Sequence, residues 1–125
     1  MRVHAFVPLA EAPRGKFVIL RHGQEMHFVA APLSLHAYHA QIVFAFIQEQ
    51  GRGEAVLISS GQCAIRTPGW KVLGGGQYEW LPEERILRLK EKSTAYGRYP
   101  AQVVARSAAE ILPALGCPGF RLDLA

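Results

Sequence analysis

The alternation of apolar and polar residues along the chain predicts six β-strands. Strands are indicated by short apolar runs or period-two alternation, bounded by turns rich in glycine and proline. Segments with these patterns are residues 2–8, 16–21, 54–60, 70–80, 85–92 and 120–124. Residues 23–32 and 61–69 have no clear period, so we expect loops there.

Apolar residues at helical spacing predict a first helix that ends near Gly51. Its apolar face is formed by Leu35, Tyr38, Ile42 and Phe46. The start of this helix is open. Ser34 is a suitable N-cap, which places His39 in the second turn, whereas a start near Tyr38 places His39 among the free N–H groups of the first turn.

A second helix is predicted to begin at Pro100 and to end near Pro113 and Gly116. Its apolar stripe consists of Val104, Ala108, Ile111 and Leu115. The resulting order, ββαβββαβ, predicts an α/β fold in which a single mixed β-sheet packs with two helices. A chain of 125 residues is expected to bury one core, so residues 1–125 are predicted to form one domain.

The charge and apolar content narrow the classes of function. A net charge of +4 suits an anionic ligand but is too small to indicate nucleic-acid binding. The longest apolar runs, residues 17–20 and 42–47, are too short to span a bilayer. The N-terminus lacks a signal-peptide core, so we expect a cytoplasmic protein without membrane contact and with reduced cysteines.

The acidic residues exclude one kind of phosphoryl-transfer site. The chain has a single aspartate, Asp123, so sites built on aspartate pairs or on magnesium-binding aspartates have too few ligands. If the protein is an enzyme, its chemistry is expected to use histidine and cations.

Two histidine motifs carry weaker signals. Arg21-His22-Gly23 resembles the signature of the phosphoglycerate-mutase-like histidine phosphatases, but the late second histidine of that family is missing and the match is interpreted as chance. His36 and His39 have the spacing of metal ligands on a helix. No third ligand is evident near them, so no metal site is predicted.

Four short motifs follow one another between residues 15 and 124. They are Lys16 before an apolar run, Tyr38-His39-Ala40, Leu73-Gly74-Gly75-Gly76 and Ser93-Thr94-Ala95-Tyr96-Gly97. Their order and spacing resemble those of the phosphohistidine phosphatase family, also called the Janus family.

The resemblance implies a metal-independent phosphatase without a cofactor. Its partner would be a phosphorylated protein substrate, dephosphorylated at phosphohistidine or phospholysine, and the enzyme would be a monomer or a weak dimer. The essential histidine of the family falls on His39, and the lysine that helps to hold phosphate falls on Lys16. The remaining expected substrate-binding positions are Ala40, Ser93, Thr94 and Ala95.

These residue types suit phosphoryl transfer on physical grounds. A neutral imidazole can attack phosphorus or take a proton from the attacking water. The free N–H groups of a helix N-terminus and of a tight turn attract phosphate oxygens, and Lys16 adds a full positive charge. This interpretation favours the helix start near Tyr38.

Three positions depart from the family pattern. An acidic residue after the histidine motif is replaced by Gln41, and an arginine after the glycines is replaced by Gln77. The loop before the helix, around Ala31, also lacks a cation. Because glutamine cannot replace the charge of arginine, a second hypothesis stays open: a phosphate- or phosphoprotein-binding module without turnover.

Overall fold

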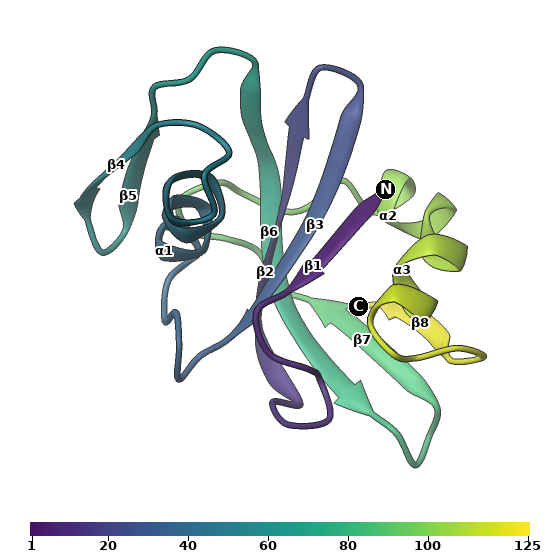
Figure 1. Cartoon of the computed structure of the whole chain (residues 1–125). Helices are drawn as coiled ribbons and strands as arrows, with labels where there is room; N and C mark the ends of the chain where they lie inside the picture. The colour runs from purple at the N-terminus through teal and green to yellow at the C-terminus, as the bar shows by residue number, and fades with distance from the viewer.

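The computed structural model describes all residues, 1–125, and contains a six-stranded mixed β-sheet (Figure 1). Its strands are β1 (Arg2–Ala5), β2 (Arg14–His22), β3 (Glu25–Pro32), β6 (Trp70–Leu81), β7 (Ile86–Lys90) and β8 (Arg121–Leu124). Their order across the sheet is β1-β3-β2-β6-β7-β8. The pairs β1–β3 and β7–β8 are parallel and the others antiparallel, so the predicted α/β class with a mixed sheet is confirmed.

The expectation of a single sheet is wrong. Strands β4 (Ala55–Ser59) and β5 (Gln62–Ile65) form a separate two-stranded hairpin next to the first helix. Residues 61–69 were expected to be a loop, but Gln62–Ile65 pairs with β4. The segment has no period-two pattern because its residues are all exposed or half-buried.

The expectation of a loop over residues 23–32 is also wrong, because most of this segment forms β3. This strand is buried from His27 to Pro32, since it lies between β1 and β2 and is covered on both faces. A strand buried on both faces shows no alternation. Its small residues, Ala30 and Ala31, further weaken the β-strand signal.

The helices number three, not the two that were expected. Helix α1 (His39–Phe44) continues directly into η1 (Ala45–Glu49), a π-helical turn, so the helical segment ends close to Gly51 as predicted. Tyr38 is the N-cap of α1, which confirms the later of the two possible starts. The single helix predicted after Pro100 is instead α2 (Ala101–Arg106) and α3 (Ala108–Ala114), separated at Ser107.

Local backbone chemistry explains the break between α2 and α3. The hydroxyl of Ser107 donates a hydrogen bond of 2.9 Å to the carbonyl of Val103, and its backbone leaves the helical region. Serine competes in this way with the regular helical pattern. The predicted order ββαβββαβ is therefore corrected to three strands, α1, four strands, two helices and β8.

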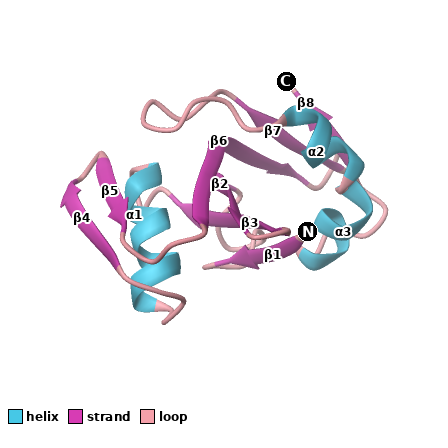
Figure 2. Cartoon of the chain, turned by 90° about the horizontal axis from the view of Figure 1, so that it is seen from above, coloured by secondary structure: helices cyan, strands magenta, loops and turns pink.

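The helices pack on opposite sides of the sheet and create two cores. Helix α1 and η1 cover β2 and β3, where Val18, Leu20, Ile42 and Phe46 are fully buried. Helices α2 and α3 lie at the other end of the molecule, where α2 contacts edge strand β8 and α3 contacts edge strand β1 (Figure 2). Because the adjacent helices α2 and α3 contact both edge strands, the sheet must be strongly curved. The core that includes residues of α2 and α3 fills its concave side.

Candidate phosphate-binding site

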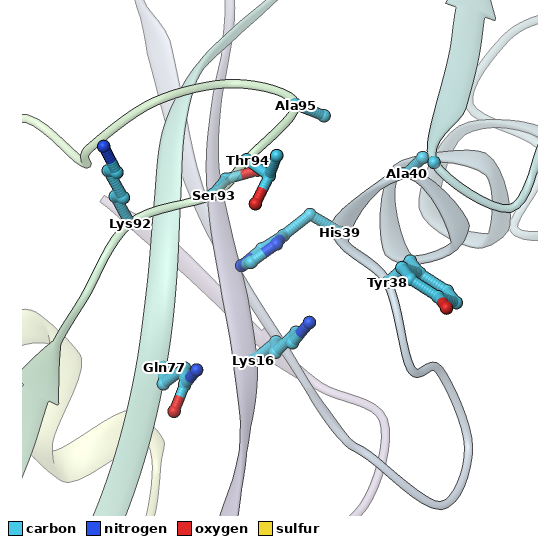
Figure 3. A pocket seen from close by; sticks show the side chains of 10 residues that line it. Lys16, Tyr38, His39, Ala40, Gln77, Lys92, Ser93, Thr94 and Ala95 are labelled. Atoms are coloured by element: carbon cyan, nitrogen blue, oxygen red, sulfur yellow. The ribbon is translucent and has the colours of Figure 1, made fainter.

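A pocket of about 360 Å³ lies where β2, the start of α1 and the turn after β7 come together (Figure 3). It is lined by Lys16, Tyr38, His39, Ala40, Gly61, Gln77, Lys92, Ser93, Thr94 and Ala95. All six site residues predicted from the sequence are among them. Folding thus brings together segments that lie up to 79 positions apart in the sequence, from Lys16 to Ala95.

The ring of His39 is buried and held in one orientation. Its Nε2 atom lies 2.9 Å from the carbonyl oxygen of Gly76. Because a carbonyl oxygen only accepts hydrogen bonds, Nε2 must carry the proton and donate it. In the neutral ring this leaves Nδ1 unprotonated, with its lone pair available.

The unprotonated Nδ1 atom belongs to the edge of the ring that faces away from β6. The opposite edge, Cδ2 and Nε2, packs against Gly75 and Gly76. Nδ1 makes no hydrogen bond within the protein, and the buried side-chain atoms without a partner are confined to His27, Trp70 and Tyr96. Nδ1 is therefore open to the pocket.

The surroundings of His39 keep its ring neutral near pH 7. Burial lowers the pKa of His39 from its ordinary value of 6.5, and the positive charge of Lys16 lowers this pKa further. The hydrogen bond to Gly76 acts in the opposite direction without outweighing burial. A neutral imidazole with a free lone pair is the form required of a nucleophile or a general base.

None of the three consecutive glycines, Gly74 to Gly76, leaves room for a side chain. A Cβ at Gly75 would lie 2.9 Å from His39 Cδ2, and a Cβ at Gly76 would lie 2.5 Å from the carbonyl oxygen of Lys90. Gly74 has φ of 143° and lies against the backbone of Arg98. The register between β2 and β6 shifts here, because Leu73 is an extra residue in β6. Gly74, Gly75 and Gly76 thus mark a bulge and a close approach of neighbouring backbones, which is what glycines within a strand indicate.

The turn after β7 is closed by its own backbone. Ser93 and Gly97 exchange two hydrogen bonds, of 3.1 and 2.8 Å, and the Ser93 hydroxyl accepts a hydrogen bond of 3.1 Å from the N–H of Tyr96. Gly75 donates to the carbonyl of Gly97 at 3.0 Å, which fixes the turn to β6. Ser93 is thus buried as a structural support, and Thr94 and Ala95 are exposed at the pocket.

At the pocket, the backbone N–H groups of His39, Ala40, Thr94 and Ala95 have no acceptor within the protein. Two come from the first turn of α1 and two from the turn after β7, and Figure 3 shows the His39 ring between that turn and Lys16. Unpaired N–H groups combined with lysine charge attract anions, and no aspartate or glutamate lines the pocket.

The structure adds Lys92 to the candidate site, which the sequence did not single out. In the sequence, Lys92 is the last residue of the strand predicted over residues 85–92. The strand ends earlier, at Lys90, because Glu91 has φ of 63° and turns the chain towards the pocket. A positive φ at a glutamate gives no signal in the residue pattern.

Three positions depart from the family pattern, residues 31, 41 and 77, and the structure shows what surrounds each of them. Gln77 lies on the pocket wall, between Lys16 of β2 and Lys90 of β7 in the strand register. The Oε1 atom of Gln41 accepts a hydrogen bond of 3.2 Å from the N–H of Tyr38 and so caps α1 without charge. Ala31 is buried in the sheet opposite Lys16.

The other histidine motifs lie outside this pocket. His22 stands at the far end of β2 from Lys16 and stacks on Trp70, with ring centroids 4.5 Å apart. His36 packs edge-on against Phe6, whereas His39 binds Gly76, so the two do not converge. No group of three or more histidine, cysteine, aspartate or glutamate side chains is placed to hold a metal ion.

Comparisons with known families and with curated proteins find no match to this chain. None of its helices has the length and apolar character needed to cross a membrane.

Proposed function

We propose that this protein is a metal-independent phosphatase that hydrolyses phosphohistidine, or phospholysine, on proteins. The proposal includes a distant relationship to the phosphohistidine phosphatase (Janus) family and a cytoplasmic, monomeric or weakly dimeric protein. The observation that carries it is the buried His39, whose Nε2–H donates to Gly76 and whose Nδ1 faces a pocket with free N–H groups.

The arrangement assigns a role to each group in the reaction. The phosphoryl oxygens bind the free N–H groups of His39, Ala40, Thr94 and Ala95, with Lys16 supplying a full positive charge. Phosphoryl transfer needs mainly such positioning and charge stabilisation. The pocket needs no carboxylate for this, which agrees with its lack of acidic residues.

His39 can act in two ways that the same geometry supports. In the first, Nδ1 attacks phosphorus, the P–N bond of the substrate breaks, and water then hydrolyses the phosphohistidine formed on His39. In the second, Nδ1 takes a proton from a water molecule while that water attacks phosphorus and the P–N bond breaks. In both, the leaving nitrogen of the substrate gains a proton from water.

A non-catalytic phosphate-binding module of the same fold is the second candidate. The position of Gln77 favours it, because a neutral amide stands on the pocket wall where a cation would hold phosphate more strongly. The backbone N–H groups still hold an anion in that case, but the pocket provides less stabilisation of the transferring group.

The decisive experiment measures phosphate release from a phosphohistidine protein and from a phospholysine polymer, in EDTA, for the wild type and for His39→Ala. Release by the wild type and a loss of at least about a hundredfold in the variant are expected if His39 is the nucleophile or base. Circular dichroism checks that the variant is folded.

Two outcomes would contradict the catalytic proposal. Release that persists in His39→Ala would remove His39 from the reaction. If neither protein releases phosphate but both bind inorganic phosphate, observed as NMR shifts of the Thr94 and Ala95 amides, the protein is the binding module.

A further inference from the structure

A second hollow opens directly beside the candidate pocket, between the tip of the β4–β5 hairpin and the turn after β7. Its volume is about 360 Å³. Gly61 and Ala95 line both this hollow and the candidate pocket, so the two are continuous. We call it the hairpin cleft and define it by its six lining residues: Ser59, Gly61, Gln62, Cys63, Ala95 and Tyr96.

The hairpin is held at its base and open at its tip. Strands β4 and β5 pair only with each other, at one end of the molecule next to α1 (Figure 2). At the base, the N–H of Glu54 donates a hydrogen bond of 2.7 Å to Thr67 Oγ1. The N–H of Ala55 donates one of 2.9 Å to Gln48 Oε1. At the tip, a Cβ on Gly61 would meet no atom within 4 Å, which leaves space for a ligand.

The polar side chains of Ser59 and Gln62 in the hairpin cleft are uncharged and exposed. The hydrogen bonds between side chains and the hairpin lie at its base, and neither the Ser59 hydroxyl nor the Gln62 amide has a partner within the protein. A hydroxyl and a carboxamide can each donate and accept a hydrogen bond. They can therefore bind the N–H and C=O groups that every residue of a polypeptide main chain presents.

Two other hollows adjoin the candidate pocket, and both contain charged side chains that are already bonded within the protein. One is reached past Gln77, and in it Lys90 pairs with Glu79 at 2.8 Å. The other is reached past Lys92, and in it the guanidinium of Arg98 donates hydrogen bonds to neighbouring oxygens. The hairpin cleft differs from both, because it has no charged side chain and its polar side chains are unpaired.

The position of the phosphoryl group requires a path for the substrate main chain. A phosphorylated histidine or lysine carries this group at the end of its side chain, so the main chain of the substrate must lie outside the pocket. The free N–H groups of Thr94 and Ala95 are the proposed phosphate ligands, and the hairpin cleft begins at Ala95. The cleft is therefore within reach of a chain whose phosphoryl group lies at His39.

We infer that the polypeptide chain that carries the phosphorylated residue lies in the hairpin cleft, where the Gln62 amide and the Ser59 hydroxyl bind its main chain. The cleft then recognises a polypeptide and not a particular sequence, because it has no charged side chain and binds groups that all residues share. This inference rests on the proposed function for the position of the phosphoryl group.

The kinetic test compares a phosphohistidine peptide flanked by glycines with phosphoramidate, which has no main chain and fits within the candidate pocket. Ser59→Ala and Gln62→Ala should each lower kcat/KM for the peptide about fivefold, because each removes one hydrogen bond. Both variants should hydrolyse phosphoramidate at the wild-type rate. Replacing the flanking glycines by leucines should leave the size of the loss unchanged, since the main chain stays the same.

Matched variants outside the cleft are the controls. Ser60→Ala and Gln102→Ala change exposed residues that line neither the pocket nor the cleft, and they should leave kcat/KM for both substrates unchanged. Peptide hydrolysis that is equal in the wild type and in both cleft variants would overturn the inference. A loss that depends on the flanking side chains, or that extends to phosphoramidate, would contradict binding of the main chain.

Binding without turnover separates this inference from the proposed function. In His39→Ala, the glycine-flanked phosphohistidine peptide should shift the NMR signals of the Ser59 and Gln62 amides, whereas inorganic phosphate should not shift them. If these shifts occur but the wild type hydrolyses neither substrate, the proposed hydrolysis fails and the main-chain site stands. If the wild type hydrolyses the peptide and the shifts are absent, the proposed function stands and the main-chain site is overturned.

Discussion

At the scale of single residues, the tautomer of His39 determines what the pocket can do. The donor bond from Nε2 to Gly76 leaves Nδ1 as the reactive nitrogen, and the neutral ring is favoured by burial and by Lys16. A protonated ring has no lone pair at either nitrogen, so activity requires a pH above the pKa of His39.

This predicts the pH dependence of hydrolysis. Because the pKa of His39 is lowered from 6.5, kcat/KM for phosphoramidate should fall in acid with a midpoint below pH 6.5. Lys16→Met removes a charge that lowers this pKa, so the midpoint should move to higher pH, and kcat/KM at pH 8 should fall about tenfold or more because phosphate loses a cation. Lys71→Met, an exposed lysine outside the pocket, is the control.

Phosphoramidate itself titrates in the same way for every variant. A difference in the pH midpoint of kcat/KM between two variants therefore comes from the protein. A midpoint that is the same in Lys16→Met and in the wild type would contradict the assignment of the acid limb to His39.

Gly75 provides a second prediction at this scale. The methyl group of Gly75→Ala would lie 2.9 Å from His39 Cδ2 and 2.5 Å from the carbonyl oxygen of Phe17, so the ring must move away from Gly76. We expect kcat to fall by about tenfold or more, since small displacements of reacting groups are costly. Melting temperature should fall as well. Gly61→Ala adds a methyl group with no atom within 4 Å and should leave the melting temperature unchanged.

At the scale of secondary-structure elements, the start of α1 places His39 and Ala40 with their N–H groups free. The amide of Gln41 caps this end through the N–H of Tyr38. A carboxylate at the same position would interact favourably with the positive end of the helix dipole.

Two glutamine substitutions test this end effect with opposite signs. Gln41→Glu should raise the free energy of unfolding by about 0.5 kcal/mol, because the charge lies in the first turn of the helix. Gln50→Glu places the same charge at the C-terminal end of the continuous segment α1–η1 and should lower the free energy of unfolding by a similar amount. Urea denaturation at low salt measures both, and equal effects of the two substitutions would contradict the helix-end explanation.

Elements with one buried face were the most predictable from the sequence. In β7, Leu87 and Leu89 alternate with Arg88 and Lys90, because only one side of the strand meets the core. The glycine motif in β6 was also informative, since three glycines in a strand indicate a bulge or close contact. Strand β3 was missed because burial on both faces removes the alternation that identifies a strand.

The candidate site was predictable where chemistry and sequence order coincide, and not where it depends on tertiary contacts. The motifs around His39 and Thr94 indicate anion binding through their residue types and their order alone. Lys92 was missed because the positive φ of Glu91 redirects it, and the partner of Nε2 was missed because Gly76 lies 37 residues from His39. Residue patterns report periodicity, whereas these contacts depend on how the sheet curves.

At the scale of the whole molecule, the α1 side of the sheet contains a buried histidine that the candidate site does not use. His27 is 2% exposed and lies among the rings of Phe46 and Trp70. Its Nδ1 is 3.2 Å from Nε2 of His4, and its own Nε2 has no hydrogen-bond partner. The charged groups that act on it are His4, Arg52, Glu25 and Arg2.

This burial predicts a loss of stability in acid. Burial, followed by the effects of His4 and Arg52, lowers the pKa of His27 from 6.5 to about 4, and Glu25 opposes this only in part. Between these two values the unfolded chain binds a proton that the folded protein does not, so the free energy of unfolding falls as the pH is lowered. From pH 7 to pH 5 the contribution of His27 is about 2 kcal/mol.

His27→Phe tests this prediction, because phenylalanine keeps a ring in the apolar cluster and does not titrate. Urea denaturation at pH 7 and pH 5 should show a decrease in the free energy of unfolding that is about 2 kcal/mol smaller in the variant than in the wild type. His22→Phe, an exposed histidine that stacks on the same Trp70, is the control and should keep the full decrease. If both variants retain it, the acid sensitivity arises from other groups, and His27 contributes packing alone to the core under α1.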